Sequence, residues 1–260
     1  MKTLLSVAAG ILLLAAATPG KAADLLLPAK EPPPGQGFTW TGFYIGANFG
    51  GAWGSVAYSG SDTLGGAPVA TSAGSYNSSG IFGGGQFGFN YQFPNNLVLG
   101  FESDYAYSSL HGSTATCIAV GCASATSSLD NFGSIRGRVG YAFSNVLLYG
   151  TGGGAWGFGH SSVTLTSAPG IPSLVGSSGS DTSEPIGAAA GGGLEWAFLP
   201  HFTLKAEYLH LQYNGIQQTY NYGLVGAGGV PFVGTTSANL GVNTVRIGVN
   251  WLFNLGSGLR

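Results

Sequence analysis

The sequence predicts an all-β protein, an eight-stranded antiparallel up-and-down transmembrane β-barrel, and three observations lead to this fold class. Only 7% of the 260 residues are charged, and 47 residues are glycine. Between residue 31 and the terminal Arg260 the basic residues all lie in strand-like runs, on the parity opposite to the apolar residues: Arg136, Arg138, Lys205 and Arg246. Beyond the N-terminus no apolar stretch approaches the ~20 residues that a membrane-spanning helix needs. A closed barrel is the other structure that satisfies every backbone group in hydrocarbon.

The orientation of the charges is the reverse of that in a soluble sheet. In the run 97–107 the odd positions are mostly apolar, whereas Glu102 and Asp104 share the even face, as the period of two in a strand requires. An arginine or lysine that faces lipid at mid-bilayer costs about 2–4 kcal/mol, whereas a polar interior tolerates it. We therefore expect the apolar face of each strand to contact lipid and the charged face to line the lumen.

The N-terminal region precedes the predicted barrel. A basic residue at position 2, an apolar run over 4–17 and small residues after it are typical of a secretory signal peptide, so residues 1–22 are expected to be removed. Residues 23–39 are rich in proline and are expected to form an extended periplasmic tail. The barrel is expected over residues 40–253, and residues 254–260 form a C-terminal extension.

Strands and connections follow from the alternation along the chain. The predicted strands are 42–57, 80–93, 97–109, 129–143, 146–159, 186–199, 202–213 and 241–253. The connections 94–96, 144–145 and 200–201 are tight, whereas 58–79, 110–128, 160–185 and 214–240 are long, rich in Ser, Gly and Thr, and expected to be loops. Short turns in the periplasm and long loops outside the cell are the arrangement of outer-membrane barrels.

Each strand has an expected outer face. The clearest outward residues are Phe87, Phe89, Tyr91, Phe93, Ile135, Val139, Tyr141, Phe143, Leu194, Trp196, Phe198, Leu204, Ala206, Tyr208, Val245, Ile247, Val249, Trp251 and Phe253. The strand 146–159 is ambiguous, because two sets of residues compete for its outer face: Leu147, Tyr149 and Ala155 against Leu148, Trp156 and Phe158.

The predicted lumen is electrically balanced. Its acidic residues are Glu102, Asp104, Glu195 and Glu207, and its basic residues are Arg136, Arg138, Lys205 and Arg246. The hairpin between the third and fourth strands places Glu102 and Asp104 beside the two arginines, and the turn at 200–201 places Glu195 beside Lys205 and Glu207. Buried charges are tolerated when they are paired, so we interpret the cluster as a structural plug. Because each acid has a basic neighbour, we predict no catalytic residues and no enzyme activity.

Aromatic residues are expected to form two girdles at the membrane interfaces. The periplasmic girdle contains Trp40, Phe43, Tyr91, Phe93, Tyr141, Phe143, Trp196, Phe198, Phe202, Trp251 and Phe253. The outer girdle contains Trp53, Tyr105, Tyr107, Trp156 and Phe158. A soluble aromatic core would not require this separation into two levels.

Cys117 and Cys122 are expected to close one loop of an exported chain as a disulfide, worth about 2 kcal/mol in the chain-entropy model. A metal site is the alternative, but only His111 is near them in the sequence, so no metal is predicted.

The remaining motifs exclude further function classes. After removal of the signal peptide the net charge is near −4, so no basic surface for nucleic acid is expected. Two glycine patterns, at 83–88 and 152–157, match the spacing of a dinucleotide-binding loop, but strand flanks them on both sides and neither opens a helix.

Several stretches together resemble a known family. They are ADL at 23–25, WTGFYIGAN at 40–48, RGRVGYAF at 136–143, LYGTGG at 148–153, KAEYL at 205–209 and VRIGVNWLF at 245–253. The chain resembles the small alphaproteobacterial outer-membrane proteins, also called outer-membrane immunogenic or porin-family proteins. The resemblance covers essentially the whole chain and implies an eight-stranded barrel of the cell outer membrane that maintains the envelope and is exposed at the surface.

The resemblance also implies partners and alternatives. Outer-membrane lipid, lipopolysaccharide and the barrel-assembly machinery are the expected partners, with Phe253 as the aromatic assembly signal, although residues 254–260 follow it here. No cofactor is expected for a structural barrel with at most a narrow pore. The alternatives are a small-solute porin and a surface protein that binds heme, since some relatives are reported to bind heme. The candidate heme ligands are His111, His160 and His210 near the outer rim, and Tyr213, Tyr220 and Tyr222 in the last predicted loop.

Overall fold

The structure is a computed structural model that describes residues 38–254, apart from 119–120, 171 and 227. The predicted signal peptide at 1–22, the tail up to residue 37 and the extension from residue 255 lie outside the described residues. No helix in the described part of the chain is long and apolar enough to cross a membrane.

The described chain is built almost entirely of antiparallel strands. They are β1 (Gly42–Leu64), β2 (Ala67–Gln92), β3 (Leu97–Ile118), β4 (Gly121–Phe143), β5 (Val146–Ser167), β6 (Ser178–Ser183), β7 (Ile186–Leu199), β8 (Phe202–Val225) and β9 (Val230–Asn254). A short 3-10 helix, η1 (Pro172–Leu174), lies between β5 and β6.

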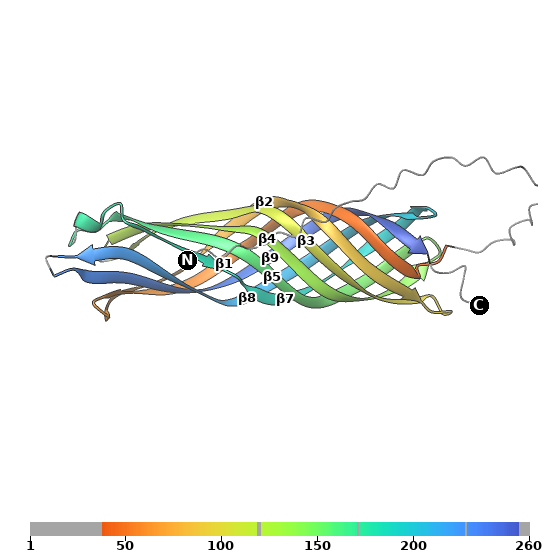
Figure 1. Ribbon diagram of the computed structural model, residues 1–260, viewed down its shortest axis with the longest axis horizontal. Helices are drawn as coiled ribbons and strands as arrows, with labels where there is room; N and C mark the ends of the chain where they lie inside the picture. The colour runs from red at the N-terminus through yellow and green to blue at the C-terminus, as the bar shows by residue number, and fades with distance from the viewer. Residues whose placement is uncertain (1–37, 119–120, 171, 227, 255–260) are drawn as a thin grey trace, which may run out of the picture. The chain divides into compact units, whose positions relative to one another are not determined.

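The sheet closes into a barrel (Figure 1). Its order is β4-β3-β2-β1-β9-β8-β7-β5, and the pairing of β4 with β5 closes the ring. β6 and β7 share one position, because both pair with β5: β7 with Val146–Trp156 and β6 with Gly159–Thr164. The ring of described strands therefore has eight strand positions, and the predicted fold class is confirmed.

The strands are longer than the sequence predicted. The segments 58–79, 110–128 and 214–240 are mostly paired strand, and 160–185 contains the end of β5, η1 and β6. The prediction of four loops was wrong, because toward the tips of the hairpins the alternation reverses: polar residues, many of them serine and threonine, face outward while residues such as Tyr58 and Tyr76 face inward. At Gly65 and Gly66 the backbone has φ of 59° and 84°, which closes the β1–β2 hairpin as a tight turn.

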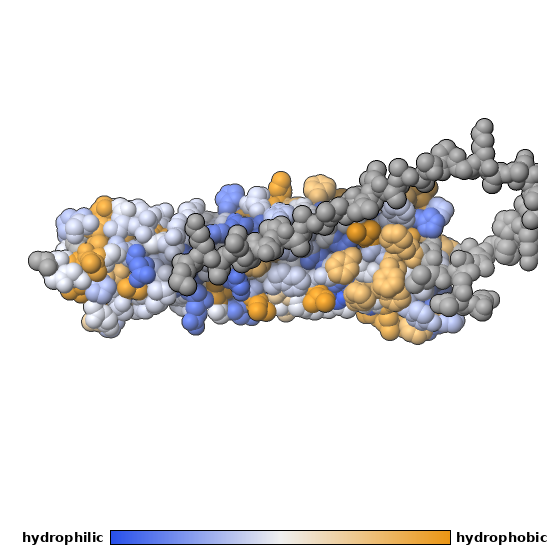
Figure 2. Space-filling view, in the orientation of Figure 1, coloured by the Kyte–Doolittle hydropathy of each residue, from blue (hydrophilic) through white to orange (hydrophobic). Residues whose placement is uncertain are grey.

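The two ends of the barrel differ. We call the end with the connections 94–96, 144–145 and 200–201 the turn end, and the end with the extended hairpins the hairpin end (Figure 1). Figure 2 shows apolar side chains gathered toward the turn end and a mostly pale surface at the hairpin end. Outward residues change from apolar to polar along single strands: Trp53 to Ser55, Ile81 to Ser79, Tyr107 to Ser109, Phe158 to His160, Tyr208 to His210 and Val245 to Asn243.

We call the outward apolar surface between the turn end and these changes the apolar band. On this band Phe49 is 65% exposed and Ile81 is 68% exposed. A soluble protein rarely leaves so many large apolar side chains next to one another in water. In β5 the ambiguity is resolved, because Leu147, Tyr149 and Ala155 are buried inward while Leu148 and Phe158 are exposed.

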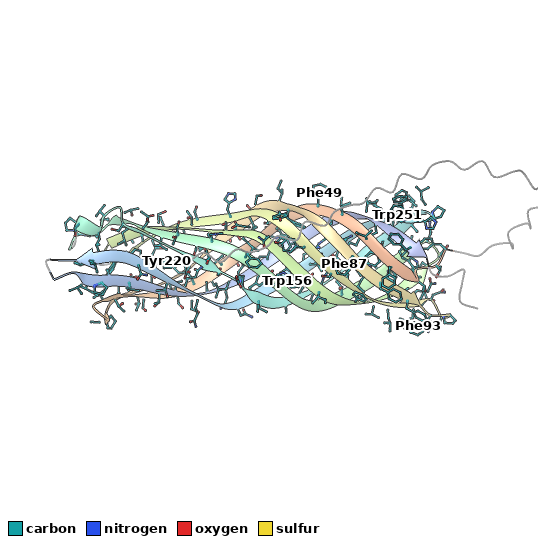
Figure 3. All side chains as sticks on the ribbon, viewed as in Figure 1. Phe49, Phe87, Phe93, Trp156, Tyr220 and Trp251 are labelled. Atoms are coloured by element: carbon teal, nitrogen blue, oxygen red, sulfur yellow. A yellow bond between two sulfur atoms is a disulfide. The ribbon has the colours of Figure 1, made fainter. Side chains whose placement is uncertain are left out.

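Aromatic side chains line the turn end (Figure 3). The rings of Trp196, Phe198, Phe202, Trp251 and Phe253 form a continuous series with successive centroids 5.9, 6.4, 5.8 and 5.5 Å apart. Such a row of large rings at one level is typical of a membrane interface.

Trp40 does not belong to this series. The prediction that it faces outward was wrong, because its side chain is fully buried inside the turn end. Its Nε1 donates a hydrogen bond to the Ser144 carbonyl at 3.3 Å, and its backbone nitrogen donates to Gln92 Oε1 at 2.9 Å. Trp40 precedes β1, so the alternation of the strand does not fix its direction, and the ring fills the mouth of the barrel beside Leu147.

Candidate functional site

Eight charged side chains meet inside the barrel, at the height of the apolar band. We call them the charged layer: Glu102, Asp104, Arg136, Arg138, Glu195, Lys205, Glu207 and Arg246. None is more than 4% exposed. They are the eight lumen residues that the sequence predicted, and inward parity on β3, β4, β7, β8 and β9 brings all of them together.

Arg136 is the most fully contacted cation of the layer. Its Nη2 lies 2.6 Å from Glu102 Oε1 and 2.8 Å from Asp104 Oδ2. Its Nη1 lies 3.1 Å from Glu207 Oε2, and its Nε donates to Ser134 Oγ at 2.8 Å. Every donor group of this guanidinium therefore has an acceptor, as a buried charge requires.

Lys205 connects opposite walls of the barrel, whereas Arg138 connects two strands that flank a third. Lys205 Nζ lies 2.8 Å from Glu102 Oε1 and 3.8 Å from Glu207 Oε1. Glu195 is opposite Lys205 in strand register, but its ion pair passes over the intervening strand β5 to Arg138 Nη2 on β4, at 2.7 Å. The predicted adjacency along neighbouring strands is therefore present, whereas the ion pair of Glu195 is not the one that register alone would give.

Arg246 is held more loosely. Its Nη1 lies 3.3 Å from Asp104 Oδ1 and its Nε lies 3.4 Å from Glu207 Oε1. Its guanidinium carbon lies 5.5 Å from the centroid of the Phe82 ring, within the range of a cation–π contact.

Neutral side chains complete the layer, and sequence reasoning missed them. Tyr44 Oη donates to Glu102 Oε2 at 2.8 Å and accepts from Arg138 Nη1 at 2.7 Å, and Tyr149 Oη donates to Glu207 Oε2 at 2.9 Å. Their inward parity could have identified them, but Tyr44 was assigned to neither face of its strand and the facing of Tyr149 was left open. A Cβ at Gly88 would lie 2.4 Å from Tyr44 Oη, so this glycine makes room for the ring.

The interior is closed at three levels. Trp40 and its apolar neighbours fill the turn end, and the charged layer follows. Beyond it an apolar layer includes Phe82, Leu110, Phe132, Leu211 and Val242, all of them buried. Chemically, the charged layer neutralises itself, since four carboxylates face four cations at ion-pair distances.

The three histidines of the predicted heme site do not converge. His111 and His160 line one shallow depression on the outer face, whereas His210 lines another with Asn243. His160 Nδ1 is hydrogen-bonded to Asp130 Oδ2, and His210 Nδ1 lies 3.0 Å from Asn243 Oδ1. Within the described residues no group of three or more His, Cys, Asp or Glu is arranged to hold a metal ion.

The cysteine pair and Phe253 occupy defined places. Cys117 and Cys122 are bonded as a disulfide and lie opposite each other in the β3–β4 ladder. Phe253 is 49% exposed at the turn end, opposite Phe43 in the β1–β9 ladder.

Closed strands, an apolar outer band, aromatic rings at the turn end and charges confined to the interior together define a membrane-spanning β-barrel of the outer-membrane type. The family model described as the outer membrane protein beta-barrel domain matches residues 9–253. The chain belongs to this family. The resemblance inferred from the sequence motifs is thereby confirmed, and the protein is a protein of the cell outer membrane.

Two sequence relatives agree with this assignment. The 31 kDa outer-membrane immunogenic protein of Brucella melitensis biotype 1 is 33% identical over 245 residues, which cover 91% of this chain and 95% of the relative. The protein of the same name from Brucella suis biovar 1 matches equally, at 33% over 245 residues with the same coverage. Among solved structures, the outer membrane protein OprG from Pseudomonas aeruginosa is 13% identical with a TM-score of 0.44 and covers 82% of this chain and 97% of its own.

Proposed function

We propose that this protein is a non-enzymatic, structural barrel that maintains the outer membrane and presents its hairpin end at the cell surface, with at most a very narrow channel. The observation that carries the proposal is the filled interior: Trp40, the charged layer and the apolar layer occupy successive levels. An eight-stranded barrel is narrow enough for side chains to fill it, and this barrel places large ones there.

The outer surface supports the same role. In this proposal the apolar band contacts outer-membrane lipid and the polar hairpins meet lipopolysaccharide and solvent, with the turn end in the periplasm. Phe253, in the last strand at the turn end, is the residue proposed to be read by the barrel-assembly machinery.

Planar-bilayer recording of the purified protein tests the closed lumen. We expect no large, steady conductance steps above the background of boiled protein from the same preparation, since ions would have to cross three filled levels. Large steady steps would instead establish a small-solute porin. Deletion of the gene in the parent bacterium separately tests the structural role, because a strain whose outer membrane admits detergent no faster than before would contradict it.

Hemin capture has weaker support from the geometry, because His210 lies apart from His111 and His160. Absorbance titration with hemin, repeated on a variant with all three histidines replaced by alanine, separates that activity from the structural role. A Soret shift lost only in the variant would establish it.

A further inference from the structure

A cavity of about 460 Å³ lies inside the barrel at the hairpin end, beyond the apolar layer. This volume is within the range of roughly 300–1,000 Å³ typical of pockets that hold small molecules. Its wall is formed by inward-facing residues of the extended hairpins, and η1 adds Leu174, which is only 3% exposed. The apolar layer closes the cavity toward the charged layer, so a ligand would enter from the hairpin end.

Three aromatic rings lie in series on one side of this cavity. The centroids of Tyr220 and Tyr222 are 6.4 Å apart, and those of Tyr222 and Phe232 are 5.4 Å apart. All three side chains are buried or nearly so, and all three line the cavity. Figure 3 shows Tyr220 far from the aromatic residues of the turn end. These rings present apolar surface and negative π faces to whatever occupies the space.

Asp62 is the one charged side chain among the residues that line the cavity. A Cβ built on Gly234 would lie 2.8 Å from Asp62 Oδ1 and 2.9 Å from the Tyr222 ring, so carboxylate and ring flank the same glycine. Within the described part of the chain the Asp62 carboxylate has no hydrogen-bond or salt-bridge partner. Burial raises the pKa of Asp62 above its ordinary value, because the carboxylate has lost part of its hydration.

These features favour a particular charge on the ligand. An unpaired, half-buried carboxylate is stabilised by a nearby cation, and aromatic faces attract cations as well. No lysine, arginine or histidine lines the cavity, so an anion of the same size would find no opposite charge.

We propose that this cavity, here called the cation cavity, binds an organic cation with an apolar body, its ammonium group beside Asp62 and its body against Tyr222 and Phe232. The binding is independent of the structural role of the barrel, because the charged layer takes no part in it.

The test compares two probes of similar size and opposite charge, benzyltrimethylammonium and toluenesulfonate, by isothermal titration calorimetry. The folded protein is held in a non-ionic maltoside, because a zwitterionic detergent would itself carry a quaternary ammonium group. We expect the cation to bind and the sulfonate to give no saturable heat.

The matched variants are Asp62→Asn and Asp130→Asn. Both remove one carboxylate outside the apolar band, but Asp130 lies beside His160 and away from the cation cavity. We expect Asp62→Asn to weaken the binding of benzyltrimethylammonium by about tenfold or more, the scale expected when a contact to a charged group is lost. Asp130→Asn should leave the affinity for this probe unchanged. The difference in gel mobility between unheated and boiled samples verifies that each variant is folded.

The proposal would be overturned by no saturable heat from benzyltrimethylammonium, by equal binding of the two probes, or by a folded Asp62→Asn variant that retains wild-type affinity. Equal losses in Asp62→Asn and Asp130→Asn would also overturn it, since the effect would then reflect net charge and not the cavity.

Discussion

Two arginines of the charged layer are equally buried, each 1% exposed, yet they are held by very different contacts. Arg136 reaches three carboxylates within 3.1 Å and also donates to Ser134. Arg246 reaches its two carboxylates only at 3.3 and 3.4 Å and lies against the Phe82 ring. Loss of either cation leaves one negative charge in excess, but only the loss of Arg136 removes a full set of short hydrogen bonds.

We therefore expect Arg136→Met to destabilise the barrel by about 3–5 kcal/mol, the range for breaking a buried ion pair by removing one partner. Arg246→Met should destabilise the barrel clearly less, because the Arg246 side chain already lies partly against the aromatic ring of Phe82. Urea unfolding in lipid vesicles, followed by tryptophan fluorescence, measures both variants under one condition. Equal losses, or a larger loss for Arg246→Met, would contradict the importance given to the short contacts of Arg136.

At the scale of the elements, the wall of the described barrel has a seam between β6 and β8 without a ladder of backbone hydrogen bonds. β8 leaves β7 at Tyr213 and from Ile216 onward pairs only with β9, while β6 pairs only with β5. β6 and β8 nevertheless lie close together, as Gly179 shows: a Cβ built on this glycine would lie only 2.7 Å from the Cβ of Tyr220. The Asp181 carboxylate spans the seam and accepts a hydrogen bond from the Thr219 backbone nitrogen at 2.7 Å.

Asp181→Ala should expose this seam. Without the carboxylate the Thr219 amide has no acceptor on the β6 side, so its hydrogen exchange should accelerate by about tenfold or more. Asp181→Asn is the control, because its amide oxygen can still accept the hydrogen bond. Amide exchange followed by NMR measures both variants, with amides of β3 in the apolar band as an internal reference. Unchanged exchange at Thr219 in Asp181→Ala would show that the side chain does not hold the seam.

The elements also show which features could be predicted from the sequence. β7 spans Ile186–Leu199 and β8 begins at Phe202, as predicted, because a tight turn and strong alternation mark that boundary. The charged layer was predicted because parity alone sends Glu102 and Arg136 inward. The ion-pair partner of Glu195 was not predicted, since a contact that passes over an intervening strand depends on barrel diameter and strand tilt, which parity does not contain.

The hairpin end was the main failure of prediction, for a related reason. There many outward residues are serine and threonine, so the composition is similar to that of loops. The inward apolar residues, such as Tyr222 and Phe232, are widely spaced in the sequence. The cation cavity appears only once three extended hairpins are assembled around it.

At the scale of the whole described barrel, one set of strands serves two solvents. Between the turn end and the changes in outward residues the barrel is apolar outside and charged inside, whereas beyond them it is polar outside and apolar or aromatic inside. This inversion along continuous strands places the membrane boundary within single strands such as β2 and β9 and not at their ends.

Paired nitroxide labels on one face of one strand test this boundary. Positions Ile247 and Ser237 both face outward on β9, ten residues apart by number, or about 33 Å at ~3.3 Å per residue. In lipid vesicles we expect the label at 247 to be relaxed by oxygen, which concentrates in hydrocarbon, and the label at 237 by a water-soluble nickel chelate. Phe87 and Ser75 on β2 provide an independent matched pair with the same expectation. If the nickel chelate reached both labels of a pair equally, the apolar band would not be the surface that contacts lipid, and the inward placement of the charged layer would lose its physical reason.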